Sequence, residues 1–177
     1  MKRRDVIGVI ALLAGTPPRV RAAAPAGLTL PEPGRANADA LFAAPLIALD
    51  GQRTQLPHPQ GRPLIVNFWA RWCGPCKVEI PELVAFFFHD TAINDIYTPI
   101  QTLSLPVSFF ARAYEMDYSV LLARDGGIEL MRALGNSKAG LPFTLAIDRH
   151  GQMVAMRLGL MTREQLDAAV LLALQRT

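Results

Sequence analysis

A pair of cysteines separated only by a glycine and a proline, Cys73 and Cys76, restricts the fold of this chain more than any other feature. They are the only two cysteines in 177 residues. An apolar run at 63–70, Pro-Leu-Ile-Val-Asn-Phe-Trp-Ala, leads into them and is β-branched and aromatic, as expected of a buried strand. After them, apolar residues recur at roughly helical spacing, at Val78, Leu83 and Phe86. Pro75 falls where the first helical turn would begin, a position at which proline is tolerated. The sequence therefore predicts a dithiol at a strand-to-helix junction.

This placement has a consequence for thiol chemistry. The attacking species in thiol–disulfide exchange is the thiolate, and a helix N-terminus stabilises negative charge through its free N–H groups and its dipole. We expect Cys73, outside the first turn, to be the exposed and acidified nucleophile. Cys76, inside that turn, is expected to be shielded and to act as the resolving thiol. Gly74 and Pro75 form a stiff, narrow turn that gives a partner disulfide access to Cys73.

Three other interpretations of the cysteine pair compete with redox catalysis. A structural disulfide closing so short a loop would remove little entropy from the unfolded chain. Half of a zinc site would need a second cysteine pair or suitably spaced histidines, and the sequence has neither. The third interpretation is two unrelated buried thiols. Redox catalysis is favoured because the motif, its strand and its helix agree.

The stretch Asn67–Leu83 resembles the thioredoxin superfamily. That resemblance implies an α/β thioredoxin-like fold, a central mixed β-sheet flanked by helices, with an N-terminal β-hairpin. The most similar branch is the exported TlpA/ResA-like thiol–disulfide oxidoreductases, which include the cytochrome c maturation thioredoxins. Asn67 stands where cytoplasmic thioredoxins carry a buried aspartate, and Glu79 where this branch carries a glutamate. A carboxylate one turn from the resolving thiol can accept and return its proton, although a solvated charge on the helix surface is the alternative interpretation of Glu79.

A second stretch, Gly140–Asp148, resembles the second thioredoxin signature, a glycine-aliphatic-proline sequence followed by a strand. The resemblance implies that the Leu141–Pro142 peptide bond is cis and lies against the active-site sulfurs, where the flanking backbone pairs with substrate. An ordinary trans proline at a strand start is the alternative. Together with Trp72, this backbone would form the client-docking surface.

The N-terminus resembles an export signal. Residues 1–24 combine a basic start, the apolar run Val6–Ala14 and a small-residue cleavage site at Ala22–Ala24. The apolar run is about half the length needed to cross a bilayer, which favours cleavage over a permanent anchor. Arg3-Arg4 hints at twin-arginine export. The leader carries a net charge of +4 and the whole chain +3, so the mature protein is at about −1, and nothing indicates a nucleic-acid partner.

The rest of the chain is predicted to form a flexible lead-in at 25–40 and one thioredoxin-like domain at 41–177. Within the domain, Pro45–Leu56 reads as a β-hairpin with its turn at Asp50-Gly51. Further elements are expected as a strand at about Ile100–Leu105, a helix from Val107, a strand at Val120–Ala123 and a helix at Gly127–Leu134. A final helix begins with the capping box Thr162–Gln165.

The function expected from these features is that of an exported, periplasmic or extracytoplasmic, thiol–disulfide oxidoreductase. It would reduce disulfides of client proteins, such as apocytochrome c or copper-site cysteines, through Cys73 and Cys76. No metal or organic cofactor is expected, because the redox-active disulfide carries both electrons. The resemblance implies a membrane electron donor, and membrane contact would come only through an uncleaved leader.

The alternatives are a copper-binding or delivery module using the two thiolates, a peroxide-reducing relative of the same superfamily, and a non-catalytic interaction domain. The peroxidatic Thr-x-x-Cys context is missing from the sequence, and no histidine lies close to the cysteines along the chain. An interaction domain would leave the intact dithiol without a role.

Overall fold

A computed structural model describes residues 26–32, 37–59, 61–89, 96–99 and 107–175. The predicted leader at 1–24 and the strand expected at about Ile100–Leu105 lie outside these residues. In the described ranges, no helix has the length and apolarity needed to cross a bilayer.

The helices are α1 (Asp39–Phe42), α2 (Gly74–His89), α3 (Val107–Ala113), α4 (Gly127–Ala133) and α5 (Arg163–Gln175), with a 3-10 turn, η1 (Arg124–Gly126), directly before α4. The strands are β1 (Leu46–Ala48), β2 (Arg53–Thr54), β3 (Leu64–Phe68), β4 (Ile96–Pro99), β5 (Val120–Leu122), β6 (Phe143–Ile147) and β7 (Met153–Leu158). They form one sheet in the order β2-β1-β5-β4-β3-β6-β7. Strand β4 is parallel to β3 and β5, and the remaining pairs are antiparallel, so the sheet is mixed.

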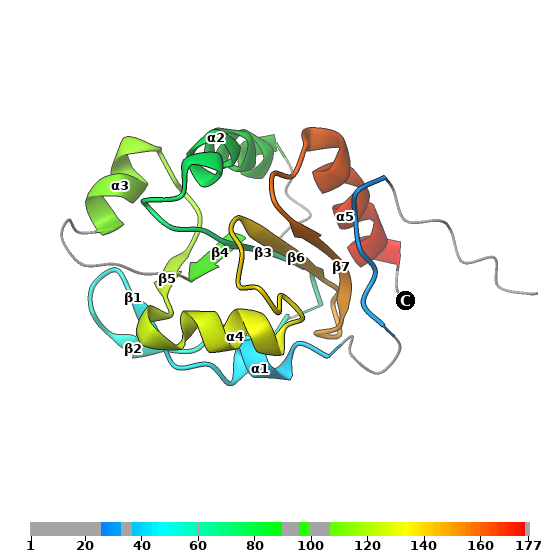
Figure 1. Ribbon diagram of the computed structural model, residues 1–177, viewed down its shortest axis with the longest axis horizontal. Helices are drawn as coiled ribbons and strands as arrows, with labels where there is room; N and C mark the ends of the chain where they lie inside the picture. The colour runs from blue at the N-terminus through cyan, green and yellow to red at the C-terminus, as the bar shows by residue number, and fades with distance from the viewer. Residues whose placement is uncertain (1–25, 33–36, 60, 90–95, 100–106, 176–177) are drawn as a thin grey trace, which may run out of the picture.

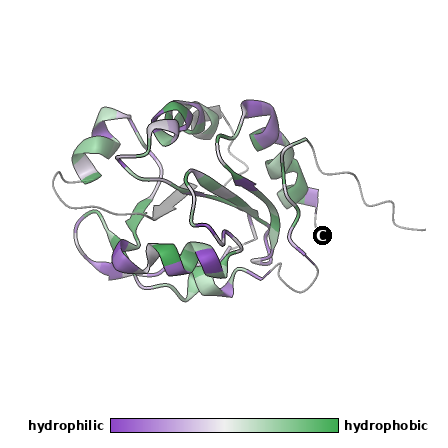
Figure 2. Ribbon diagram, in the orientation of Figure 1, coloured by the Kyte–Doolittle hydropathy of each residue, from purple (hydrophilic) through white to green (hydrophobic). Residues whose placement is uncertain are grey.

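Helices cover both faces of this sheet. Figure 1 shows α2, α3 and α5 on one side and α4 with α1 on the other. Every residue of β3 and of β6 is buried, which explains why the chain supplies nearly continuous apolar runs there. Colouring by hydropathy shows the apolar residues gathered on these central strands (Figure 2). The thioredoxin-like α/β fold predicted from the two motifs is confirmed.

Helix α2 carries the cysteine pair into the core. Its buried stripe consists of Cys76, Ile80, Leu83 and Phe86, all at most 1% exposed. These residues are three or four positions apart, as one face of an α-helix requires. Pro81 lies inside the helix. Val78, which the sequence placed on the apolar face, is 66% exposed, because two residues beyond Cys76 corresponds to the opposite side of the helix.

Most of the other predicted elements are present. The hairpin of β1 and β2 turns at Asp50-Gly51, where Gly51 has φ of +87°, a left-handed conformation that glycine adopts at little cost. The capping box of α5 is reciprocal, since Gln165 N–H donates to Thr162 Oγ1 at 3.3 Å and Thr162 N–H to Gln165 Oε1 at 3.1 Å. Strand β4 occupies Ile96–Pro99, ahead of the range proposed from the sequence.

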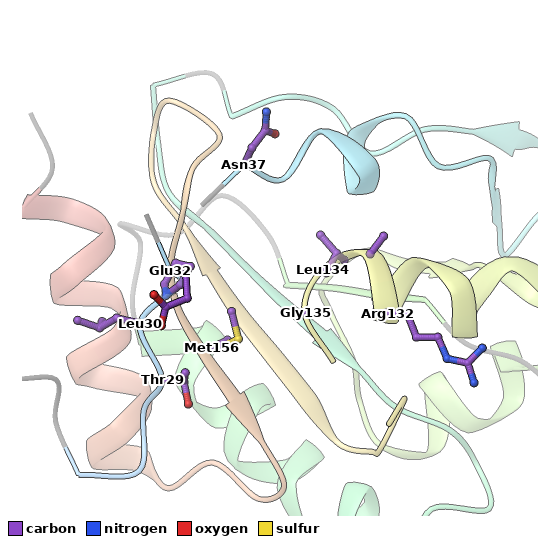
Figure 3. A pocket seen from close by; sticks show the side chains of 10 residues that line it. Thr29, Leu30, Glu32, Asn37, Arg132, Leu134, Gly135 and Met156 are labelled. Carbon is purple, nitrogen blue, oxygen red and sulfur yellow. The ribbon is translucent and has the colours of Figure 1, made fainter. Parts of the chain in front are cut away.

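The described part of the predicted lead-in lies along β7. Thr29 exchanges two backbone hydrogen bonds of 2.8 Å with Met156, and Leu28 is buried. Beside β7 lies a cavity of about 620 Å³. Figure 3 shows Thr29, Glu32 and Met156 on one side of it and Gly135, which follows α4, on the other. The short helix α1 follows this segment and was not foreseen. The division into leader, lead-in and domain stays a prediction.

The central sheet supports a prediction about stability. Leu145, in the middle of β6, is completely buried, so Leu145→Ala should lower the free energy of unfolding by about 2–5 kcal/mol. Leu171→Ala on α5 is the matched control, because that side chain is 56% exposed; its effect should stay within about 0.5 kcal/mol. Urea denaturation of the disulfide-bonded protein measures both changes. Equal losses in the two variants would contradict this assignment of the core.

Candidate active site

Cys73 and Cys76 form a disulfide at the N-terminus of α2, with their Cα atoms 5.3 Å apart. Cys73 directly precedes the first helical residue, Gly74, and so takes the N-cap position. The N–H of Cys76 donates to Cys73 Sγ at 3.2 Å, the bond that an N-cap side chain receives from the first turn. A thiolate formed at this sulfur would face the free N–H groups and the positive end of the helix dipole.

The burial of the two sulfurs differs from the expectation. Cys76 is completely buried, as predicted for a shielded thiol. Cys73 is only 4% exposed, so the prediction of an exposed residue is wrong for the disulfide form. The reason is that Cys73 belongs to the core cluster that also contains Trp69 and Ala70, whose packing covers its side chain. The neighbouring Gly74 and Pro75 are exposed, and they leave the outer side of the motif open to a partner.

Glu79 is buried in the core rather than solvated. It follows Cys76 by three residues on α2, which places both on the same helix face, and it is 2% exposed. Burial raises the pKa of its carboxyl group from 4.5 to about 7, against the opposing effects of hydrogen bonds from Met161 and Asn67 and of the charge of Arg157. The alternative of a charge on the solvated helix surface is therefore wrong. This carboxyl group changes its protonation state near neutral pH.

Both carboxyl oxygens of Glu79 accept hydrogen bonds. The backbone N–H of Met161 donates to Oε1 at 2.9 Å, and Asn67 Nδ2 donates to Oε2 at 3.0 Å. Asn67 Nδ2 also donates to Thr144 Oγ1 at 2.9 Å. Among the described residues, Asn67 Oδ1 accepts no hydrogen bond. Rotation of this amide by 180° would let Oδ1 accept from a protonated Glu79 and from the Thr144 hydroxyl, so the site has a partner for either protonation state.

Tyr118, just ahead of β5, is a further titratable group near this carboxyl. Its side chain is buried, and burial followed by the negative charge of Glu79 raises the pKa of its phenol. The phenol therefore remains protonated when Glu79 ionises. In the described ranges, no three His, Cys, Asp or Glu side chains come together as a metal site would require.

The second motif lies in the next strand of the sheet. The Leu141–Pro142 bond is cis, as predicted, and β6 begins at the following residue. Phe143, the first residue of β6, pairs with Phe68, the last residue of β3. The proline loop before β6 and the cysteine loop after β3 therefore lie at the same end of two neighbouring strands. The carbonyl of Pro142 accepts a 2.8 Å hydrogen bond from Gly159 N–H, which fixes the loop to the end of β7.

A groove of about 290 Å³ lies against Trp72, the residue before Cys73. Its lining is mainly apolar and includes Leu141 from the proline loop and Ile128 and Met131 from α4. Trp72 is 67% exposed, the most exposed of the large apolar side chains in the described ranges. The structure thus brings together all eight residues selected from the sequence, on three segments: Trp72–Cys76, Glu79 and Leu141-Pro142.

Three groups that surround Glu79 were not predicted from the sequence. They are the side chains of Thr144 and Arg157 and the backbone N–H of Met161. Thr144 carries a detectable signal, because it is the one polar residue in the buried run Phe143–Ile147. Arg157 has a similar signal as a charged residue within the apolar strand β7. The Met161 N–H has none, since any residue would supply it.

The chain matches known proteins over most of its length. A model of the Redoxin family matches residues 25–172. Thiol-disulfide oxidoreductase ResA of a Bacillus cereus strain is 27% identical over 122 residues, 67% of this chain and 68% of that protein. A thiol:disulfide interchange protein of the thioredoxin family from Chlorobium tepidum TLS has a TM-score of 0.57 at 26% identity, over 73% of this chain and 94% of that one.

A secreted disulfide oxidoreductase of Mycobacterium tuberculosis has a TM-score of 0.60, covering 75% of this chain and 97% of that one. At 18% identity this last similarity concerns the fold. The fold, the disulfide and the family match agree, and the chain belongs to the Redoxin family of the thioredoxin superfamily.

Proposed function

We propose that this protein is an exported thiol–disulfide oxidoreductase that reduces disulfides in client proteins. The observation that carries the proposal is the Cys73–Cys76 disulfide at the N-terminus of α2, one helical turn from a buried carboxyl group with a pKa of about 7. The similarity to ResA-type thiol-disulfide oxidoreductases supports the same reaction.

The reaction begins with the reduced dithiol. The Cys73 thiolate attacks one sulfur of a client disulfide, forming a mixed disulfide and releasing the other client sulfur as a thiolate. Cys76 then loses its proton, and its thiolate attacks Cys73 Sγ. The enzyme disulfide forms, the second client sulfur leaves as a thiolate, and both electrons of the dithiol have passed to the client.

Glu79 fits the role of proton acceptor for Cys76. Cys76 is fully buried, so water has little access to its thiol. A general base is most effective when its pKa lies near the working pH, and burial brings Glu79 to that range. The two hydrogen bonds to its carboxyl oxygens hold it in place while the proton moves.

Client docking is assigned to the apolar groove beside the disulfide. Trp72 offers a large exposed ring next to Cys73, and Leu141 brings the backbone of the proline loop to the same side. Gly74 and Pro75, both exposed, leave room for a client chain over the sulfurs. An extended client segment carrying its disulfide fits this arrangement, with an apolar side chain against Ile128 and Met131.

The cellular setting rests on the leader sequence. Residues 1–24 predict export to the periplasm or another extracytoplasmic compartment. In an oxidising compartment a reductant must be recharged, so we assign a membrane electron donor as the second partner. Apocytochrome c thiols and copper-site cysteines are the client classes that we propose.

Cysteine substitutions test the assigned order of attack. Cys76→Ser should accumulate a stable mixed disulfide with a Cys-x-x-Cys-His peptide disulfide, because the resolving thiol is missing. Cys73→Ser should form none, since Cys76 is buried. Mass spectrometry under non-reducing conditions distinguishes the two variants. Trapping through Cys76 alone would reverse the roles, and copper binding without any trapping would favour a metal-delivery function.

The direction of electron flow follows from the midpoint potential. A Gly-Pro spacer is that of reducing thioredoxins, so we expect a two-electron transition at about −250 mV or below. Fluorescence of Trp69 and Trp72 in graded thiol buffers reports the dithiol state, because both residues lie close to the motif in sequence. A midpoint near about −120 mV would mark a disulfide donor and reverse the proposed direction.

The pH dependence of the resolving step tests Glu79. Below pH 7 the protonated carboxyl cannot accept the Cys76 proton, so the wild-type rate should fall with a midpoint near about 7. Glu79→Gln should lose this midpoint and resolve roughly 100-fold more slowly above it. Single-turnover reduction of the peptide disulfide measures both. An unchanged pH profile in Glu79→Gln would exclude Glu79 as the base.

Stability supplies an independent check on the same titration. The pKa of Glu79 is raised on folding, so its contribution to stability is present below about pH 4.5 and is lost as the pH rises towards 7. Glu79→Gln should lack this decline in denaturation experiments on the disulfide form.

A further inference from the structure

A single peptide group connects Arg157 to the buried carboxyl of Glu79. Arg157 Nε donates to the carbonyl oxygen of Leu160 at 3.0 Å. The N–H of the same peptide group, which belongs to Met161, donates to Glu79 Oε1 at 2.9 Å. The cation therefore polarises the peptide in the sense that strengthens the bond to a negative carboxylate, since hydrogen bonds in a chain reinforce one another.

The register of the sheet places Arg157 on the side of the sheet that faces Glu79. Asn67 pairs with Thr144, and Thr144 pairs with Arg157, so the three residues form a row across β3, β6 and β7. Directly opposite residues in antiparallel strands project to the same face. Asn67 and Thr144 are hydrogen-bonded within this row, and Asn67 donates to Glu79. Arg157 is thus the outer end of a polar row that begins at the carboxyl group.

Arg157 forms no ion pair within 4.0 Å in the part of the chain that the structure describes. The ion pairs found there are Arg132–Glu129 and Arg163–Asp167. Arg163, at the start of α5, has its guanidinium carbon over the ring of Phe86 on α2, 4.6 Å from the centre of the ring. The charge of Arg157 lowers the pKa of Glu79, against the effect of burial. Tyr118, which also interacts with Glu79, is a neutral phenol because its own pKa is raised.

The N-terminal segment Ala26–Thr29 contacts the guanidinium group of Arg157 and keeps it in place. Arg157 Nη1 donates to the carbonyl of Gly27 at 2.7 Å, and Gln165 Nε2 donates to that of Ala26 at 2.8 Å. Thr29 is fixed by its backbone pair with Met156, next to Arg157. Gly27 has φ of +87°, and a Cβ there would lie 2.8 Å from Arg157 Nη1 and collide with Gln165 Nε2. Only glycine permits this close approach.

We propose that Arg157 is a positioning residue for Glu79, acting through the Leu160–Met161 peptide, and that Ala26–Thr29 keeps its guanidinium in place. The inference rests on the proposed function, because it assigns the control of the acid–base group of that reaction. It extends the active site to a segment that begins two residues after the predicted leader. Cleavage near Ala24 leaves this segment intact.

The test follows the titration of Glu79 by carboxyl ¹³C NMR in the full chain, in the disulfide form, where the cysteines do not titrate. Glu79→Gln identifies the resonance. Arg157→Met should raise the midpoint by about half a pH unit or more, because a nearby positive charge that favours the carboxylate is gone. Arg157→Lys should recover part of the shift. The pH midpoint of the resolving step should move with it, lowering the rate at pH 7 about twofold.

Two further variants keep the test decisive. Arg132→Met removes an exposed arginine at the end of α4 and should leave the Glu79 midpoint unchanged. Gly27→Ala retains the charge but displaces the guanidinium, and should raise the midpoint in the same direction even if Arg157→Met fails to fold.

A midpoint unchanged in both Arg157→Met and Gly27→Ala, or an equal shift in Arg132→Met, would overturn the inference. Absence of thiol exchange in the wild type would instead overturn the proposed function. The NMR titration would still decide whether Arg157 controls Glu79, so the two failures are distinguishable.

Discussion

The hydrogen bonding of one buried carboxyl group ties the site together. Glu79 lies in the core, where an unpaired ionised carboxylate would be very costly, so its two oxygens need donors. The donors come from β3, through Asn67, and from the turn before α5, through Met161. Thr144 on β6 then orients Asn67. A register shift of one residue in β3 or β6 would turn Asn67 or Thr144 to the other face of the sheet and leave the carboxyl without this support.

The same sheet pairing assembles the redox centre. Phe68 ends β3 and pairs with Phe143, which begins β6. The cysteine loop and the cis-proline loop therefore lie side by side at one end of the sheet. Helix α2, which begins directly after Cys73, presents Cys76 to the core at one turn and Glu79 at the next. Chain connectivity therefore places the proposed nucleophile and resolving thiol, whereas strand pairing supplies the surroundings of Glu79, the proposed proton acceptor.

The sequence predicted the parts of this arrangement that depend on local pattern. The Cys-Gly-Pro-Cys spacing, the apolar strand before it and the capping box of α5 are each determined by neighbouring residues, and the structure contains all three. The exposure of Cys73 and the orientation of Val78 were predicted wrongly, because burial depends on what packs over a side chain. Arg157 could not be connected to Glu79 from sequence, since 78 positions and a strand register separate them. The short segment before α1 has no periodicity from which its pairing with β7 could be read.

The backbone pair between Thr29 and Met156 also determines what the sheet offers to other chains. An outermost strand with free N–H and C=O groups is a template for adding a foreign strand, and such an addition can start aggregation. Here one border of the sheet is a strand of only two residues, Arg53-Thr54, and part of the opposite border is occupied by the N-terminal segment. With both edges limited in this way, the Leu141 loop beside the disulfide is where the proposed function has an extended client pair. The hydrogen bonds that protect the sheet edge against aggregation would then also direct the client to the reactive sulfurs.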